Sequence, residues 1–254
     1  MTEPRRRYLR REEPMAILDR SLHVEREAMF FLCGPDPKEN EEDDGVVTVH
    51  IRGALEHHDE GAGGDCYDLI LERASMAFAS ARAVVLRIDS PGGVVSGLNQ
   101  CVFSLQRMKR DAQKPLYIYI DEMATSAAFA LACAGDEVWL PPSGICGSVG
   151  VISSMISLAG ANDKAGVQVV MIASGKRKTD GHPNAPITDN AIAAEQARVD
   201  DLAQQFFKIA SKARGLSVET IEGYEAGLFL GRKAVKAGLA DGVSGWAGFL
   251  DALG

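Results

Sequence analysis

Three short segments of the sequence carry residues that could form the active site of a hydrolase. Each follows an apolar stretch predicted to be a strand: DSPGG follows the stretch ending at Ile88, EMATS the one ending at Ile120, and SGKRKTDG the one ending at Ala173. In open α/β sheets, ligand sites gather beyond the carboxyl ends of the strands. The three junctions therefore offer a glycine pair, a serine and lysines at one edge of the predicted sheet, and no histidine.

Ser126 of the second segment is a candidate nucleophile. A serine hydroxyl attacks a carbonyl when a base takes its proton, and lysine is that base in Ser-Lys variants of the catalytic triad. An ordinary lysine has a pKa of about 10.4, so a lysine acting near neutral pH needs burial among apolar groups. The small residues Ala127 and Ala128 behind Ser126 fit that requirement. The simpler alternative for Ser126 is a helix N-cap.

The SPGG turn and the helix expected after Ser126 are candidates for stabilising an oxyanion. Glycine has no side chain to shield its backbone N–H, so a substrate carbonyl can approach closely. The start of a helix adds further N–H groups and the positive end of the helix dipole. The alternative for SPGG is an ordinary tight turn after a strand.

The hydrophobic pattern predicts an α/β fold with a largely parallel sheet, because continuous apolar strands alternate with helices. Residues 1–45 are expected to form an N-terminal arm and an acidic linker, with an apolar segment at 14–32. Residues 46–254 are expected to form a single domain. Strands are predicted at residues 46–51, 83–89, 115–121, 136–140, 148–153 and 167–174, and helices at 67–80, 97–111, after Ser126 and at 189–214.

Composition excludes several classes of protein. The net charge of −8 over 254 residues argues against a general nucleic-acid binder, although RRRYLRR near the N-terminus is a local basic patch. Five cysteines without a C-x-x-C pair, and histidines without ligand spacing, predict reduced thiols and no metal site. The pair His57 and His58 is expected in an exposed loop. No signal peptide or membrane span is visible, so a cytoplasmic protein without cofactors is expected.

Taken together, the motifs RIDSPGG, ATSAAFALACAGDEVWLPPSGICGSVGVIS and VQVVMIASGKRKTDGHP resemble the signal-peptide-peptidase-A family of serine peptidases. That family shares the Clp-protease and crotonase type of fold, with repeated ββα units, a mostly parallel sheet and flanking helices. The resemblance extends from about residue 46 to residue 254. It implies Ser126 as nucleophile and Lys178 as general base, with Lys176 as the rival lysine.

The resemblance also implies roles for three further residues. Ser148 matches the position whose hydroxyl orients the lysine amine, and its alternative is a serine at a strand edge. The backbone N–H groups of Gly93 and Ala127 would form the oxyanion hole. Ala127 stands where the family has glycine, and it still donates its N–H. Asp89 has no catalytic role in this scheme and is expected to stabilise a turn.

Within the family, the chain resembles the minor capsid protein C group of tailed phages, the head maturation proteases. The resemblance implies protein substrates such as scaffold and capsid proteins, bound by strand addition, a homo-oligomer, and a location in the cytoplasm or the phage procapsid. Three alternatives stay open: a bacterial protease of the same family, a capsid component without activity, and a crotonase-type acyl-thioester enzyme. The last needs a basic pocket for a nucleotide, which the sequence does not show.

Overall fold

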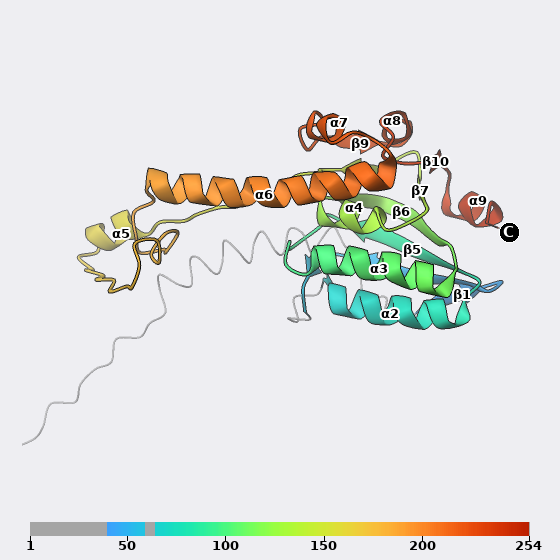
Figure 1. The fold of residues 1–254 in the computed structure, drawn as a ribbon, viewed down its shortest axis with the longest axis horizontal. Helices are drawn as coiled ribbons and strands as arrows, with labels where there is room; N and C mark the ends of the chain where they lie inside the picture. The colour runs from blue at the N-terminus through green and yellow to red at the C-terminus, as the bar shows by residue number, and fades with distance from the viewer. Residues whose placement is uncertain (1–39, 59–63, 254) are drawn as a thin grey trace, which may run out of the picture.

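The structure of the protein is a computed structural model that describes residues 40–58 and 64–253. Its centre is an eight-stranded sheet in the order β1-β2-β5-β6-β7-β10, and β8 joins the second half of β6 and pairs with β9 (Figure 1). All pairs are parallel except β1 with β2 and β8 with β9. The strands are β1 (Glu41–Asp43), β2 (Val46–Arg52), β5 (Ala83–Ser90), β6 (Leu116–Thr125), β7 (Glu137–Leu140), β8 (Ile145–Gly147), β9 (Leu228–Leu230) and β10 (Gly242–Val243).

Helices cover both faces of this sheet. One face packs against α2, α3, α4 and α6, and the other is covered in part by α9 (Figure 1). The strands β3 (Leu55–Glu56) and β4 (Asp65–Cys66) form a small separate sheet. The helices are α2 (Tyr67–Ser80), α3 (Leu98–Ala112), α4 (Ala127–Ala132), α5 (Ala159–Lys164), α6 (Asp189–Arg214), α7 (Val218–Glu222), α8 (Arg232–Lys236) and α9 (Trp246–Asp251).

The predicted α/β fold is confirmed, and the packing explains the apolar runs. On β5, Val84, Leu86 and Ile88 join the main core beneath the helices, whereas Val85 joins a second cluster with Phe249 of α9. A strand that is covered on both faces needs apolar residues at successive positions, because its side chains alternate between the faces. The predicted helix at 67–80 has the bounds of α2, and the one at 189–214 has the bounds of α6.

The acidic segment before residue 46 differs from the linker that was expected. Glu41–Asp43 is strand β1, paired antiparallel with β2 at the edge of the sheet. Asp44 and Gly45 make the turn between them, with φ of 44° and 72°. An edge strand exposes its side chains to water, so acidic residues are tolerated there. The rest of the predicted arm and its apolar segment 14–32 lie outside the described residues.

Two predicted strands, at 148–153 and 167–174, do not form, although both segments lie within the described residues. The first ends in, and the second lies within, a segment of irregular backbone with the short helix α5. This segment, residues 151–188, is here called the projecting segment and extends away from the sheet beside α6 (Figure 1). Ile152 and Ile172 in it are each 97% exposed. These two predictions are wrong, because β-branched residues favour strands but a strand also needs a partner, and the described chain offers none here.

The long helix α6 is anchored at its C-terminal end. Arg214 donates to both carboxylate oxygens of Asp241 at 2.9 and 2.7 Å and to the carbonyl of Gly238 at 2.8 Å. Asp241 in turn accepts from the backbone N–H of Val138 in β7. Paired guanidinium–carboxylate bonds fix orientation as well as distance, so this end of α6 is tied to the sheet.

Among the described helices, none is both long and apolar enough to cross a membrane.

The four cysteines of the described residues, Cys66, Cys101, Cys133 and Cys146, are buried. Burial raises the pKa of Cys101, Cys133 and Cys146 to about 12. These thiols therefore stay protonated at neutral pH and behave as small core residues.

Asp89 lies near the end of β5, and its neighbourhood disfavours a charge. Burial, followed by the nearby carboxylate of Asp121, raises the pKa of Asp89 to about 6. Asp121 itself is bound by Arg87, at 2.8 Å from Nε. A carboxyl group with a raised pKa binds its proton more tightly in the folded than in the unfolded chain, so its ionisation destabilises the fold.

We predict that Asp89→Asn stabilises the protein at neutral pH by roughly 1 kcal/mol, a value reduced for solvent screening because the carboxyl is only half buried. The gain should be present above about pH 6 and disappear as the pH falls towards about 4, where Asp89 is protonated in both states. Urea unfolding across this pH range measures it, with the exposed Asp201→Asn as control. If both substitutions change the free energy of unfolding equally at neutral pH, the pKa of Asp89 is not raised by its surroundings.

Candidate active site

Ser126 occupies the sharp turn between β6 and α4. Its backbone has φ of 52° and ψ of −125°, a conformation that residues with a side chain rarely adopt. The N–H of Ser126 donates to the carbonyl of Gly147 in β8 at 2.9 Å, which holds the turn against the neighbouring strand. The side chain of Ser126 makes no cap hydrogen bond to α4. The N-cap alternative is therefore wrong, and strain at a turn that presents a hydroxyl is typical of nucleophile positions.

The glycine pair packs directly against this turn. A Cβ on Gly92, whose φ is 101°, would lie 2.7 Å from the carbonyl oxygen of Thr125 and 2.9 Å from the nitrogen of Ala127. The buried hydroxyl of Ser90 accepts from the N–H of Gly92 at 3.1 Å, and Thr125 Oγ1 donates to the carbonyl of Pro91 at 3.0 Å. The position therefore requires glycine, and the loop is held within contact distance of the nucleophile turn.

Two backbone N–H groups beside Ser126 have no acceptor in the described chain. In the loop, the carbonyl of Gly92 and the N–H of Val94 both bond to Leu55, which leaves the N–H of Gly93 free. The N–H of Ala127 belongs to the first turn of α4, where no intrahelical acceptor exists. Gly93 and Ala127 are the two predicted oxyanion donors, and free N–H groups at these positions suit that role.

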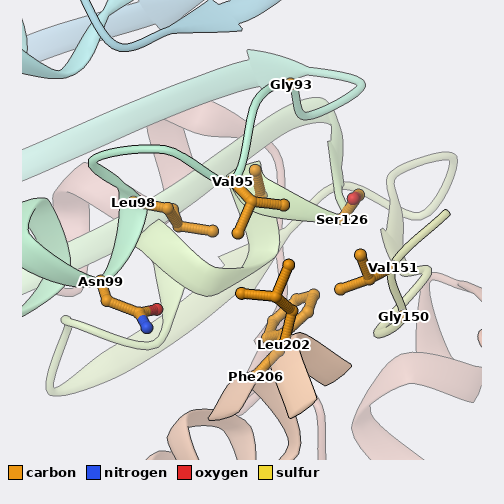
Figure 2. Close-up of a pocket in the computed structure, with 10 residues that line it drawn as sticks. Gly93, Val95, Leu98, Asn99, Ser126, Gly150, Val151, Leu202 and Phe206 are labelled. Atoms are coloured by element: carbon orange, nitrogen blue, oxygen red, sulfur yellow. The ribbon is translucent and has the colours of Figure 1, made fainter. Parts of the chain in front are cut away.

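A pocket opens next to Ser126, lined mainly by apolar side chains. Figure 2 shows Ser126 at one edge and Leu202 and Phe206 of α6 entering from another. No cationic side chain is among the lining residues, so the pocket gives no support to an acyl-thioester enzyme with a bound nucleotide. The lining residues are Gly93, Val95, Leu98, Asn99, Ser126, Ala127, Gly150, Val151, Leu202 and Phe206.

Sequence analysis missed the contribution of α6 to this pocket. Leu202 and Phe206 are four residues apart and so share one face of the helix, but that spacing indicates only a packed face. Nothing in the sequence shows that this face meets the turn of Ser126. The exposed side chain of Asn99 adds a polar link, since its amide donates to Gln205 of α6 at 2.7 Å.

Ser148 lies beside Ser126 at the ends of two paired strands. Thr125 of β6 pairs with Gly147 of β8, and each serine is the next residue on its strand. Both serines have φ of 52°. The N–H of Ser148 donates to the carbonyl of Gly227 at 2.9 Å. The structure therefore brings together four of the five predicted site residues: Ser126, Ser148, Gly93 and Ala127.

Lys178 is the predicted site residue that the chain does not bring to Ser126. It is exposed and belongs to the projecting segment, which extends beyond the N-terminal end of α6 (Figure 1). About 20 Å of helix separates Asp189, where α6 begins, from Leu202 in the pocket. The expectation that the third junction meets the other two is wrong within one chain, because residues 167–174 do not join the sheet.

The fold resembles that of a known peptidase. A structure of the 1510-N membrane-bound stomatin-specific protease superimposes with a TM-score of 0.52 at 15% sequence identity, covering 83% of this chain and 85% of that one. The architecture is thus shared with this protease, an α/β fold with a mostly parallel sheet and flanking helices as predicted from the sequence, and identity this low speaks for the fold alone.

The family follows from sequence comparison. Residues 108–253 match the model of peptidase family S49, and the chain belongs to that family. It is 34% identical over 203 residues to the head-tail preconnector protein GP5 of Enterobacteria phage P21, covering 78% of this chain and 40% of the relative. It is 30% identical over 203 residues to capsid assembly protease C of Escherichia phage lambda, covering 78% and 46%. The chain spans under half the length of these relatives.

We predict that the strain at Ser126 reverses the usual order of glycine and alanine. In an ordinary position, glycine is less stable than alanine by about 0.5–1 kcal/mol. Here Ser126→Gly should unfold with a free energy about 1 kcal/mol higher than Ser126→Ala, because only glycine adopts a positive φ without strain. Urea denaturation measures the difference. As a control, Gly160 in α5 has open space around it, so Gly160→Ala should be more stable than the parent. If alanine is also more stable than glycine at residue 126, the backbone there is not strained.

Proposed function

We propose that the protein is a serine endopeptidase that processes capsid or scaffold proteins during phage head maturation. The observation that carries this proposal is the turn of Ser126. Its hydroxyl makes no cap hydrogen bond and lies beside two N–H groups that have no acceptor among the described residues. Ser126 attacks the peptide carbonyl, and Gly93 and Ala127 stabilise the resulting oxyanion. The relation to a phage capsid assembly protease supports the substrate class, and its place of action is the cytoplasm or the procapsid.

The general base in this proposal is Lys178 of a neighbouring copy of the chain. Within one chain Lys178 is exposed and distant from Ser126, so a base from the same chain would require the projecting segment to fold back. Apolar side chains in and beside that segment are exposed, which is costly for a free monomer and favours burial against another copy. They are Ile152, Ile156, Val167, Val169, Val170, Ile172, Ile187 and Ile192. Docked in this way, the amine of Lys178 would be desolvated, and the hydroxyl of Ser148 could form a hydrogen bond with it.

The pocket beside Ser126 supports cleavage next to apolar side chains. Val95, Leu98, Leu202 and Phe206 line it, and Leu98 and Phe206 are buried. A pocket of this kind gains by burying a methyl or methylene group and offers no partner for a charge. Substrates with small or medium apolar residues at the cut are therefore expected.

The dyad is tested by a cleavage time course on an unfolded protein substrate. Ser126→Ala and Lys178→Ala should each lower the rate by at least about 10³-fold, because nucleophile and base act as one unit. Lys176→Ala, an exposed lysine two residues away, is the matched control and should retain activity. If all variants cleave equally, the peptidase proposal fails. If the parent is inactive on capsid and scaffold proteins as well, the protein is a structural capsid component.

A neighbouring copy as the source of Lys178 predicts complementation. When inactive Ser126→Ala and Lys178→Ala chains are unfolded together and refolded, about one quarter of the sites should combine an intact serine with an intact lysine, and activity should return to that level. The double variant mixed with Ser126→Ala is the control and should stay inactive. No recovery in the mixture would place both residues of the dyad in the same chain.

The apolar residues of the projecting segment should hold the copies together. Ile172→Glu is expected to shift the mass measured by light scattering towards the monomer and to lower cleavage with it. Met76→Glu places the same charge on an exposed apolar residue of α2, outside the projecting segment, and should leave the mass unchanged. Equal masses for the two variants would contradict this interface.

A further inference from the structure

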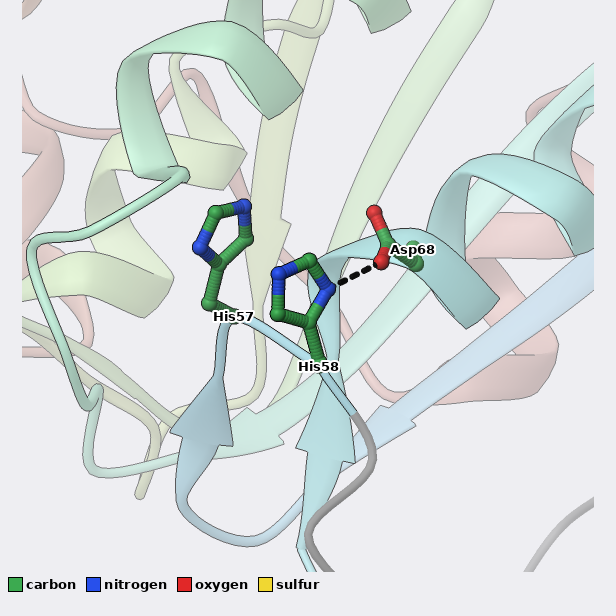
Figure 3. Close-up of side chains that lie close together, drawn as sticks. All are labelled: His57, His58 and Asp68. Atoms are coloured by element: carbon green, nitrogen blue, oxygen red, sulfur yellow. Dashed lines mark hydrogen bonds and ion pairs between the residues drawn. The ribbon is translucent and has the colours of Figure 1, made fainter.

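His57, His58 and Asp68 form a cluster that the proposed catalytic site does not use. The two histidines directly follow β3, and Asp68 is the second residue of α2. Figure 3 shows the three side chains gathered between these elements, with His58 facing Asp68. Sequence spacing does not reveal the cluster, because Asp68 is ten residues from His58 and meets it only through the parallel pairing of β3 with β4, in which Glu56 lies opposite Cys66.

The three side chains offer donor atoms at short range. His58 Nδ1 lies 2.5 Å from Asp68 Oδ2, and the rings of His57 and His58 stack with centroids 3.9 Å apart. One ligand atom from each of the three residues lies within 4.8 Å of the other two. His58 and Asp68 are 65% and 59% exposed, so both are accessible from solvent and free to rotate.

The donor set selects a class of ion. Two imidazole nitrogens and one carboxylate oxygen are ligands of zinc and of related divalent transition metals, whereas calcium and magnesium prefer oxygen donors alone. Zinc binds these donors at about 2.0–2.2 Å. Rotation of these exposed side chains would bring one donor atom of each to that distance from a single ion. Three protein ligands leave a fourth position for water.

A neighbouring hydroxyl supports the orientation of His57. Ser96 Oγ lies 3.1 Å from His57 Nδ1, and the ring of His57 packs so closely on Gly97 that a Cβ there would lie 2.4 Å from it. Metal-binding histidines commonly use their second nitrogen in such a hydrogen bond, which fixes the ring. Ser96 and Gly97 belong to the same loop as Gly93, so the cluster also contacts the segment beside Ser126.

We propose that His57, His58 and Asp68 bind one divalent transition-metal ion of the zinc class. The ion links the end of β3, the first turn of α2 and, through His57 and Ser96, the loop of residues 91–97. Binding is a property of the fold and goes beyond the proposed peptidase activity, which uses none of these three side chains.

Zinc titration of the full chain, after treatment with a chelator, tests the proposal. Calorimetry should give one Zn²⁺ per chain, and the midpoint of thermal unfolding should rise with zinc concentration, since the ion binds the folded state. His58→Gln and Asp68→Asn should each weaken binding by at least about tenfold. Both side chains are exposed, so these variants are expected to fold. His182→Gln, another exposed histidine, is the matched control and should bind like the parent.

Co²⁺ as a spectroscopic probe separates this site from a thiol site. Nitrogen and oxygen ligands give weak visible bands, whereas a thiolate ligand adds an intense charge-transfer band in the near ultraviolet. We expect the weak bands alone, lost in His58→Gln and retained in a Cys33→Ser variant. The proposal is overturned by any of three results: no zinc binding to the parent, binding by both site variants as tight as that of the parent, or a thiolate band that disappears with Cys33, a cysteine outside the described residues.

Discussion

The structure depends on one backbone constraint, the reversal of β6 into α4 at a residue with a side chain. Ser126 must hold a positive φ there, and the surrounding strands supply what keeps it in place. Gly147 binds its N–H, Thr125 ties the turn to the loop of Pro91, and Gly92 gives that loop the room to approach. Strain of this kind costs about 1–3 kcal/mol and persists only where neighbouring contacts determine the geometry. The hydroxyl is then presented at a fixed place beside free N–H groups.

Elements that bury their side chains within one chain were predictable from the sequence. The apolar run from Ala83 to Leu86 must be covered on both faces, and this alone indicates a central strand of a layered α/β fold. The spacing of Ile70, Ala74 and Phe78 likewise indicates the buried face of α2. At the site, the glycine pair was predictable because a loop this close to the nucleophile turn requires glycine at Gly92, whereas Ser126 was predictable from its motif and not from its strained backbone conformation.

The projecting segment was not predictable in the same way. Val169, Val170 and Ile172 have the pattern of a buried strand, yet they are exposed here. Hydrophobic pattern records that a residue is to be buried and says nothing about which chain covers it. Lys178 follows these residues, so it too is not brought to Ser126 within one chain. The contact of His58 with Asp68 is not predictable for a different reason, since it depends on the pairing of the two-residue strands β3 and β4, which are too short to give a sequence pattern.

The anchored end of α6 has a mechanical consequence. Arg214 and Asp241 hold the helix at the sheet, while the projecting segment and Lys178 lie past its opposite end. The helix is about 39 Å long, so a tilt of about 5° at the anchor moves the far end by about 3 Å. Movement on that scale decides whether two groups touch. Because α6 is fixed at one end, the curvature of an assembly that packs against its other end would determine whether a lysine from one copy reaches the serine of the next, and the same tilt would shift Leu202 in the pocket beside Ser126.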